Sequence, residues 1–229
     1  MKKNIYAEVV IEDGKVIINE DTDTNKVRSV TLIANSHRCI VRTAKLISKE
    51  RLTPKTQWRL VQDHFPMGNL LNENTHIFDG SLFENISGEQ CFLMVAIPKD
   101  ISQAITEEAK VKWYSVYKFK ALDTIEHILF RHYTNLKNKN PISEWIIFPQ
   151  DAGFRVLVLE DGLPISAHYI SNHPEYRESE LERAWDTVKK VIILTRPFSD
   201  STWIEQFMRS RGVDDISTEE LLPINKFTQ

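Results

Sequence analysis

The stretch WIIFPQDAGFRVLVLEDGLPISAHYI, residues 145–170, contains three runs of apolar and β-branched residues separated by two polar turns. Such runs are typical of short strands, and Asp161-Gly162 is a dipeptide that favours a tight hairpin turn. We therefore predict three antiparallel-looking strands over residues 145–149, 154–159 and 165–170. This hairpin sheet in the second half of the chain is the starting point for the fold.

On either side of this sheet the sequence alternates between strand and helix patterns. After it, we predict a helix from about Pro174 to Lys189, a buried strand over 191–195, a helix that Ser199–Ser201 cap and Gly212 ends, and no strong element in the tail. Before it, we predict a hairpin of strands 5–11 and 15–18 around a turn at Asp13-Gly14. Further strands are predicted over 27–34, 38–43, 91–97 and 113–119. Between residues 69 and 90 we predict short strand pieces, with turns at Asp79-Gly80 and Ser87-Gly88. The predicted helices before the sheet begin at Thr53-Pro54, span 101–110, and run through Leu122 to Leu136. This order indicates an α/β (α+β) protein with mixed sheets flanked by helices.

Length and composition are those of a globular protein. The chain has 229 residues, of which 41% are hydrophobic and 27% charged, and its net charge is −3. A nucleic-acid-binding domain usually has a basic excess, so we expect no nucleic-acid partner. The longest apolar runs, such as FLMVAI, are far shorter than the roughly 20 residues that cross a bilayer. We expect a cytoplasmic protein that is not itself transmembrane, with Cys39 and Cys91 as buried free thiols.

Local motifs for catalysis, metal binding or cofactor binding are absent from the sequence. The chain has only seven glycines and contains neither GxGxxG nor GxxxxGK[ST], although phosphate-binding loops need glycine for close backbone approach. His127 and His132 lie five residues apart, which does not match the i, i+4 spacing of helical metal ligands. We therefore expect no cofactor, no metal and no catalytic residues of a local type. An active site assembled from distant positions leaves no such signature and stays open as an alternative.

Four stretches together resemble a known family. They are VRTAKLISKERLTPKTQWRLVQDHFP with QCFLMVAIPKDI, then FKALDTIEHILFRHY, then the hairpin stretch 145–170, and finally VKKVIILTRPFSDSTWIEQFMRSRGV. Over roughly residues 27–215 their order is similar to that of the actin-like assembly proteins of type IV pili and type II secretion, the PilM and GspL kind. The resemblance implies a bilobed actin-like (ribonuclease-H-like) fold, with a first subdomain over 1–120 and a second over 121–229.

The nucleotide-binding loops that such a resemblance implies are altered in this chain. An active member carries Asp-x-Gly and small residues in two hairpin turns, whereas here the first turn has only Asp13-Gly14. The second has Asp151 and Gly153, followed by Phe154-Arg155 in place of small residues. The glycine-rich adenosine loop is replaced by Thr195-Arg196-Pro197, and Arg and Pro cannot give the close approach that glycine gives. Asp151 and Gly153 thus remain weak candidates for cofactor binding, and we expect turn roles for both.

The leading hypothesis is a non-catalytic actin-like scaffold. It would bind a protein partner, such as a membrane-anchored component of a pilus or secretion complex, at the inner face of the cell membrane, and a homodimer stays open. The alternatives are an enzyme with dispersed active-site residues and a nucleic-acid-binding module. Clustered titratable groups in one deep pocket would favour the enzyme. Salt-dependent binding would favour the nucleic-acid module.

Overall fold

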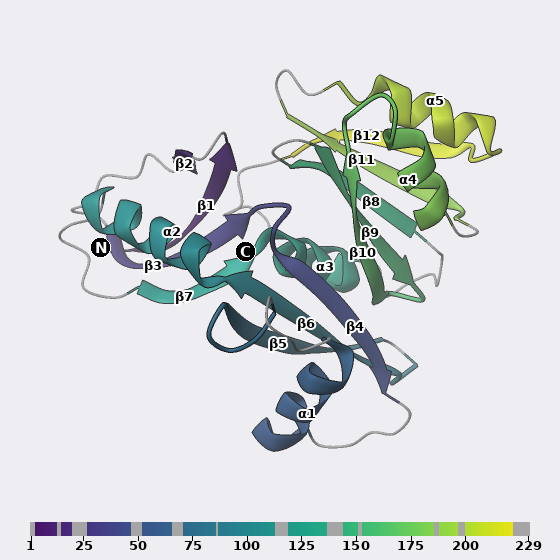
Figure 1. Cartoon of the computed structure of the whole chain (residues 1–229). Coiled ribbons are helices and arrows are strands. Elements are labelled where there is room, and N and C mark those ends of the chain that lie inside the picture. Colours follow the sequence, from purple (N-terminus) through teal and green to yellow (C-terminus); the bar gives the residue numbers. More distant parts are fainter. Residues whose placement is uncertain are drawn as a thin grey trace.

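A computed structural model gives the fold of the chain. It describes residues 3–12, 15–19, 27–46, 52–65, 71–85, 87–112, 119–136, 144–150, 153–185, 188–196 and 200–221. These residues form three sheets and five helices, arranged as two lobes with a smaller module attached to the first (Figure 1).

The second lobe contains a five-stranded sheet in the order β10-β9-β8-β11-β12. Its strands are β8 (Glu144–Gln150), β9 (Gly153–Glu160), β10 (Leu163–Ser171), β11 (Lys190–Thr195) and β12 (Asp215–Glu220). The first three are antiparallel neighbours, as the sequence predicts, whereas β11 pairs parallel with both β8 and β12. The two helices of this lobe are α4 (Arg177–Ala184) and α5 (Thr202–Ser210).

Alternate residues of β8 enter two different hydrophobic clusters. Trp145 and Ile147 pack in the cluster that contains residues of α4 and α5, on one face of the sheet. Ile146 and Phe148 pack with α3 (Ile125–Leu136) on the other face. Because helices cover both faces, all seven residues of β8 are buried, which explains the unbroken apolar character of the strand.

The first lobe repeats most of this connectivity. Its sheet has the order β2-β1-β3-β7, built from β1 (Lys3–Glu12), β2 (Lys15–Asn19), β3 (Val27–Asn35) and β7 (Phe119–Thr124). A hairpin, β1 with β2, is again followed by two strands that add in parallel, first β3 and then β7. The helix α2 (Lys99–Lys112) packs its buried side chains against this sheet.

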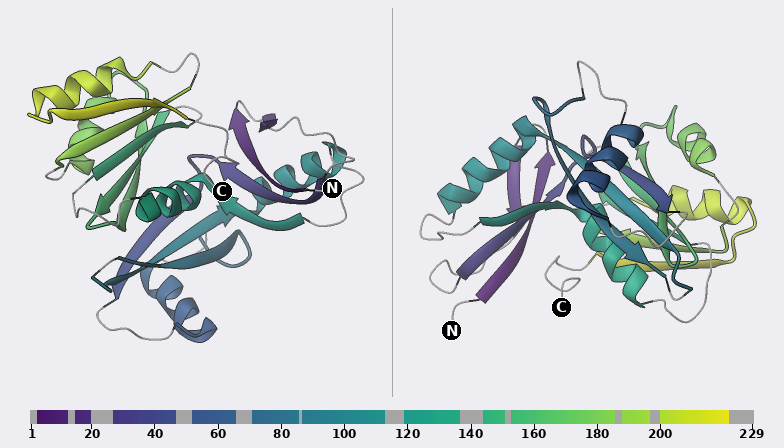
Figure 2. Two further views of the ribbon diagram at one scale, coloured as in Figure 1. Left: turned by 180° about the vertical axis from the view of Figure 1, so that it is seen from behind. Right: turned by 90° about the horizontal axis from the view of Figure 1, so that it is seen from below.

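An inserted module lies between β3 and α2 in the sequence. It consists of β4 (Ile40–Leu46), α1 (Pro54–His64), β5 (His76–Glu84) and β6 (Gln90–Pro98), with the strand order β4-β6-β5. The apolar run of β6 is buried on both faces, because Leu93 and Val95 join the cluster around α3 whereas Phe92 and Met94 join the cluster around α1. Figure 2 shows the module, with α1, beside the first lobe and α3 between the module and the second lobe.

Several element predictions need correction. The predicted turn at Asp79-Gly80 is wrong, because β5 continues through both residues. A Cβ at Gly80 would lie 2.8 Å from the carbonyl oxygen of Leu93, so close packing against β6 explains this glycine. The turn at Ser87-Gly88 is confirmed, with a φ of 76° at Gly88.

Two further helices differ from their predicted bounds, and one strand was not predicted. Leu122 belongs to β7, so the helix predicted from it begins at Ile125. α4 is shorter than predicted, since Trp185 adopts an extended conformation and ends it. The tail contains β12, which the sequence analysis missed. The predicted strand 113–119 lies largely outside the described residues, and the division at residue 120 stays a prediction.

Both cysteines are free and buried, as predicted. The thiol of Cys91 donates to the carbonyl oxygen of Pro164 over 3.0 Å, which joins β6 to the start of β10. Burial raises the pKa of Cys91 to about 11. The thiol is therefore protonated at neutral pH, as its hydrogen bond requires.

The start of α1 gives a stability prediction. Thr53 is the N-cap, and its hydroxyl oxygen accepts the backbone N–H of Thr56 over 3.2 Å. Thr53→Ala removes this bond, and we expect the free energy of unfolding to fall by about 1 kcal/mol. Urea denaturation followed by circular dichroism measures this change. Thr53→Ser keeps the cap and is expected to stay within about 0.5 kcal/mol of the wild type.

Candidate functional site

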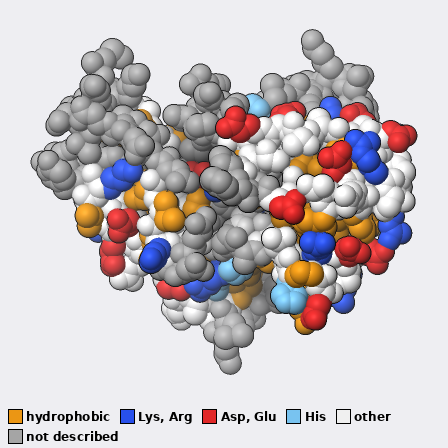
Figure 3. Space-filling model, turned by 90° about the horizontal axis from the view of Figure 1, so that it is seen from above, with side chains coloured by type: hydrophobic (Ala, Val, Ile, Leu, Met, Phe, Trp, Pro, Cys, Tyr) orange, Lys and Arg blue, Asp and Glu red, His pale blue; other side chains and the backbone are white. Residues whose placement is uncertain are grey.

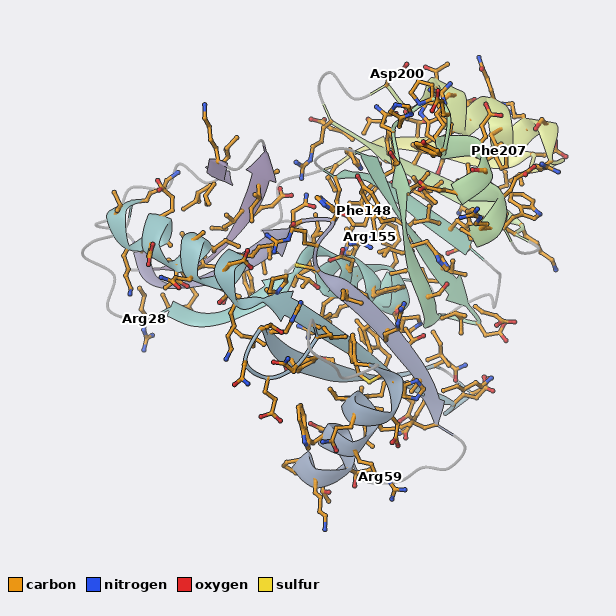
Figure 4. All side chains as sticks on the ribbon, in the orientation of Figure 1. Arg28, Arg59, Phe148, Arg155, Asp200 and Phe207 are labelled. Atoms are coloured by element: carbon orange, nitrogen blue, oxygen red, sulfur yellow. The ribbon has the colours of Figure 1, made fainter. Side chains whose placement is uncertain are left out.

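Buried charged and polar side chains gather where the two lobes meet. They come from the hairpin strands β1, β8 and β9, the start of α3 and the residue after β11. The end of β8, the start of β9 and the end of β11, which border two of the three altered loops, therefore supply residues of this site. Figure 4 shows Arg155 at the junction of the lobes.

The carboxylate of Glu126 is the most buried charge in this region, with an exposed fraction of 0%. Glu126 lies in the first turn of α3, where the helix dipole favours a negative charge. Its Oε1 accepts a hydrogen bond from Nε2 of Gln150 over 3.1 Å and lies 3.0 Å from Nε of Arg155. Its Oε2 is buried with no hydrogen-bond partner among the described residues.

Arg155 balances this carboxylate and joins the second lobe to the first. Its exposed fraction is 4%. Its Nη2 donates to the backbone carbonyl oxygens of Cys39, over 3.0 Å, and His37, over 3.4 Å, in the turn between β3 and β4. A buried carboxylate without a nearby cation would cost several kcal/mol, so the guanidinium makes the position of Glu126 tolerable.

A second ion pair crosses between the lobes beside the first. Glu8, in the middle of β1, accepts a hydrogen bond at Oε1 from Nδ2 of Asn35 over 2.7 Å. The guanidinium of Arg196, which directly follows β11, pairs with the same carboxylate. Glu8 is 7% exposed and Asn35 is fully buried. The two pairs together connect β1 and the end of β3 with β9 and the end of β11.

The candidates from the sequence have different places in this site. Asp151 lies outside the described residues, as does Asp13-Gly14. Gly153 is the first residue of β9, and a Cβ there would lie 2.1 Å from the carbonyl oxygen of Ile170. Close packing against β10 is therefore enough to require glycine at this position. Phe154, its neighbour, is buried with its ring centroid 5.9 Å from that of Trp203.

Sequence reasoning singled out Arg155 and Arg196 as substitutions in altered loops, but it missed their partners Glu8 and Glu126. Both glutamates stand inside apolar runs, YAEVVI and TIEHIL. A charged residue at a position that the apolar pattern assigns to the core is a usable signal. It indicates a buried ion pair or a functional group, because such residues are almost never fully buried unless they are paired.

Among the residues that the structure describes, the histidines belong to no candidate metal site. Within the described part of the chain, no group of three or more His, Cys, Asp or Glu side chains could hold a metal ion. Nδ1 of His127 lies 2.7 Å from Oδ1 of Asp123, and its Nε2 lies 3.0 Å from Nη2 of Arg131. His127 therefore links two neighbouring charged residues along the start of α3.

Comparison with known proteins shows which solved structures have a similar fold. No protein-family model matches the sequence, and no curated protein matches it. A solved structure described as the PilM-PilN type IV pilus biogenesis complex is similar with a TM-score of 0.57 at 12% identity, over 84% of this chain and 69% of that chain. A Bacteroides thetaiotaomicron protein described as having an actin-like ATPase fold and unknown function gives 0.54 at 8% identity, over 93% and 90%. The fold is actin-like.

The actin-like fold accounts for the two related sheets and for α3 between the lobes. It confirms the bilobed fold that the sequence resemblance implied. Among the described residues, none of the helices is both long enough and apolar enough to pass through a membrane. At sequence identities of 12% and 8% these similarities establish only the fold, so function has to be argued from the residues of this chain.

Proposed function

We propose that this chain is a non-catalytic actin-like scaffold that binds a protein partner. The observation that carries the proposal is the ion pair of Arg155 with the buried Glu126, at the place where the lobes meet. A nucleotide site there would need acidic and small groups that are free to hold a metal ion and phosphates. Here the carboxylate is already balanced by a guanidinium.

Packing at the second hairpin supports the same function. Gly153 lies so close to the backbone of Ile170 that packing within the sheet alone requires a residue without a Cβ. Arg196, at the position of the altered adenosine loop, is engaged with Glu8. Among the described residues at these loops, Arg155 and Arg196 are thus engaged in ion pairs, and Gly153 is packed within its own sheet.

The partner that we propose is a component of a pilus or secretion assembly, in the cytoplasm at the inner face of the cell membrane. Support for this choice comes from the similarity of fold to the protein described in a PilM-PilN complex and from the resemblance of element order noted in the sequence. A nucleic-acid-binding role is less well supported. Over the described residues of the face in Figure 3, basic and acidic side chains are intermixed, without the basic stripe that such a role requires.

Nucleotide titration tests the catalytic part of this proposal. We expect isothermal titration calorimetry with Mg-ATP to give no saturable heat and a phosphate-release assay to stay at the rate of the protein-free blank. An actin-like ATPase measured under the same conditions is the positive control. Saturable Mg-ATP binding that Asp151→Ala abolishes would overturn the proposal, because it would place the phosphates at the second hairpin.

The partner part needs a separate measurement. Synthetic peptides covering the cytoplasmic segments of membrane proteins encoded beside this one can be titrated by fluorescence anisotropy. We expect one of them to bind with micromolar or better affinity. Absence of binding to every such segment would contradict the assembly role, whatever the nucleotide assay shows.

A further inference from the structure

A cavity of about 380 Å³ lies between the inserted module and the second lobe. Its walls come from the start of β4, the end of β10 and the last turns of α4. Its volume is within the roughly 300–1,000 Å³ of small-molecule sites. Contacts between β4 and β10 hold the two walls together, among them the hydrogen bond from the Thr43 hydroxyl to the carbonyl oxygen of Ile165.

Positive charge dominates the lining of this cavity. Arg42, Arg155 and Arg183 line it, and among the described lining residues only Glu180 is acidic. The carboxylate of Glu180 is engaged, since it accepts the backbone N–H of Ser171 over 2.6 Å. The cavity is therefore lined by three arginines and by one glutamate whose carboxylate already has a partner.

Two of these arginines have unused hydrogen-bonding capacity. Within the part of the chain that the structure describes, the guanidinium groups of Arg42 and Arg183 make no hydrogen bond or ion pair, and both residues are exposed. Arg155, in contrast, is held in place by Glu126 and the carbonyl of Cys39. Arg42 comes from the inserted module and Arg183 from the second lobe, so an anion held by both would join the two parts.

His168 reports the positive field inside the cavity. Burial lowers its pKa, and the charges of Arg42 and Arg155 lower it further. Burial disfavours any charge, so only the contribution of the two arginines to this shift also favours an anion. The imidazole is kept in place by its Nε2, which lies 2.9 Å from the hydroxyl oxygen of Ser166.

The remaining walls fit a small organic group. Ile40, Val41, Ala167 and Ala184 line the cavity with aliphatic surface. The rings of His37 and Tyr169 lie 5.2 Å apart between centroids and add aromatic surface. The cavity thus combines charged donors with a smaller share of aliphatic and aromatic lining, against which an organic group can pack.

We propose that this cavity binds a small organic dianion, a phosphate monoester or a dicarboxylate, whose anionic group lies between Arg42 and Arg183. Guanidinium groups bind both kinds of anion through paired charge-assisted hydrogen bonds. The organic part rests against the aliphatic and aromatic walls. This inference does not rest on the proposed partner binding, and its test is independent of the outcome of the peptide titration.

Calorimetry with two small probes at constant ionic strength tests the site. Phenyl phosphate and succinate are titrated into the full chain and into Arg42→Ala and Arg183→Ala. We expect at least one probe to bind, with an affinity that falls at least about tenfold in each variant. The probe that binds more tightly distinguishes a phosphate ligand from a carboxylate ligand. The same probe is expected to raise the Tm of the wild type but not that of the double variant Arg42→Ala with Arg183→Ala.

Arg59→Ala is the matched control, because Arg59 lies on α1 far from the cavity (Figure 4). It changes the net charge equally and is expected to leave probe binding unchanged. Arg183→Lys keeps the charge but loses the paired donors, and we expect an intermediate affinity. Failure of both probes to bind, or equal weakening in Arg59→Ala, would overturn the site. Circular dichroism verifies that each variant is folded.

Discussion

Replacing Arg155 with methionine is expected to lower the free energy of unfolding by about 3–5 kcal/mol. The change leaves the buried carboxylate of Glu126 without its cation and the carbonyl of Cys39 without its donor. It also removes a link between the lobes, so the loss is expected to appear as one cooperative destabilisation of the described fold. Urea denaturation followed by tryptophan fluorescence measures the midpoint and the slope.

Two comparisons isolate the ion pair as the cause. In the double variant Arg155→Met with Glu126→Gln neither of these two positions carries a buried charge, so most of the lost stability is expected to return. Arg38→Ala removes an ion pair with Asp100 whose side chains are 50% and 64% exposed, and its cost is expected to stay below about 1 kcal/mol. If the double variant is as unstable as Arg155→Met alone, the ion pair is not what stabilises the junction of the lobes.

The three hairpin strands of the second lobe were predictable because their residues are apolar and their turns carry strong signals. β8 and β9 are buried on both faces, and Gly162 has the positive φ of 77° that its turn requires. β12 was not predictable in this way. Its sequence DISTEE is mostly polar and exposed at the edge of the sheet, so only its pairing with β11 makes it a strand.

The site could be predicted only in part, and the reason is sequence separation. Altered loops pointed to Arg155 and Arg196, since each stands where small residues were expected. Their partners could not be found from local spacing, because Glu8 and Arg196 are 188 residues apart. The cavity between β4 and β10 was equally hidden, since Arg42 and Arg183 belong to β4 and α4, which both pack against β10 only after folding.

Gly153→Ala is expected to lower the free energy of unfolding by about 3 kcal/mol. The added Cβ would lie 2.1 Å from the carbonyl oxygen of Ile170 and 2.8 Å from the hydroxyl oxygen of Tyr169. A backbone oxygen cannot move aside without disturbing the pairing of β9 with β10. The φ at Gly153 is not in the left-handed region, so steric overlap alone causes the expected loss. Urea denaturation of the variant measures it.

Gly162→Ala is the matched control, since the same atom is added in the next turn of the same sheet. Its φ is 77°, but nothing lies within 4 Å of the added Cβ. We expect it to cost only the roughly 1–2 kcal/mol of a left-handed alanine. A Gly153 variant as stable as the wild type would contradict the packing role. It would then favour the interpretation that the residue is glycine because a ligand approaches the hairpin, which would count against the scaffold proposal as well.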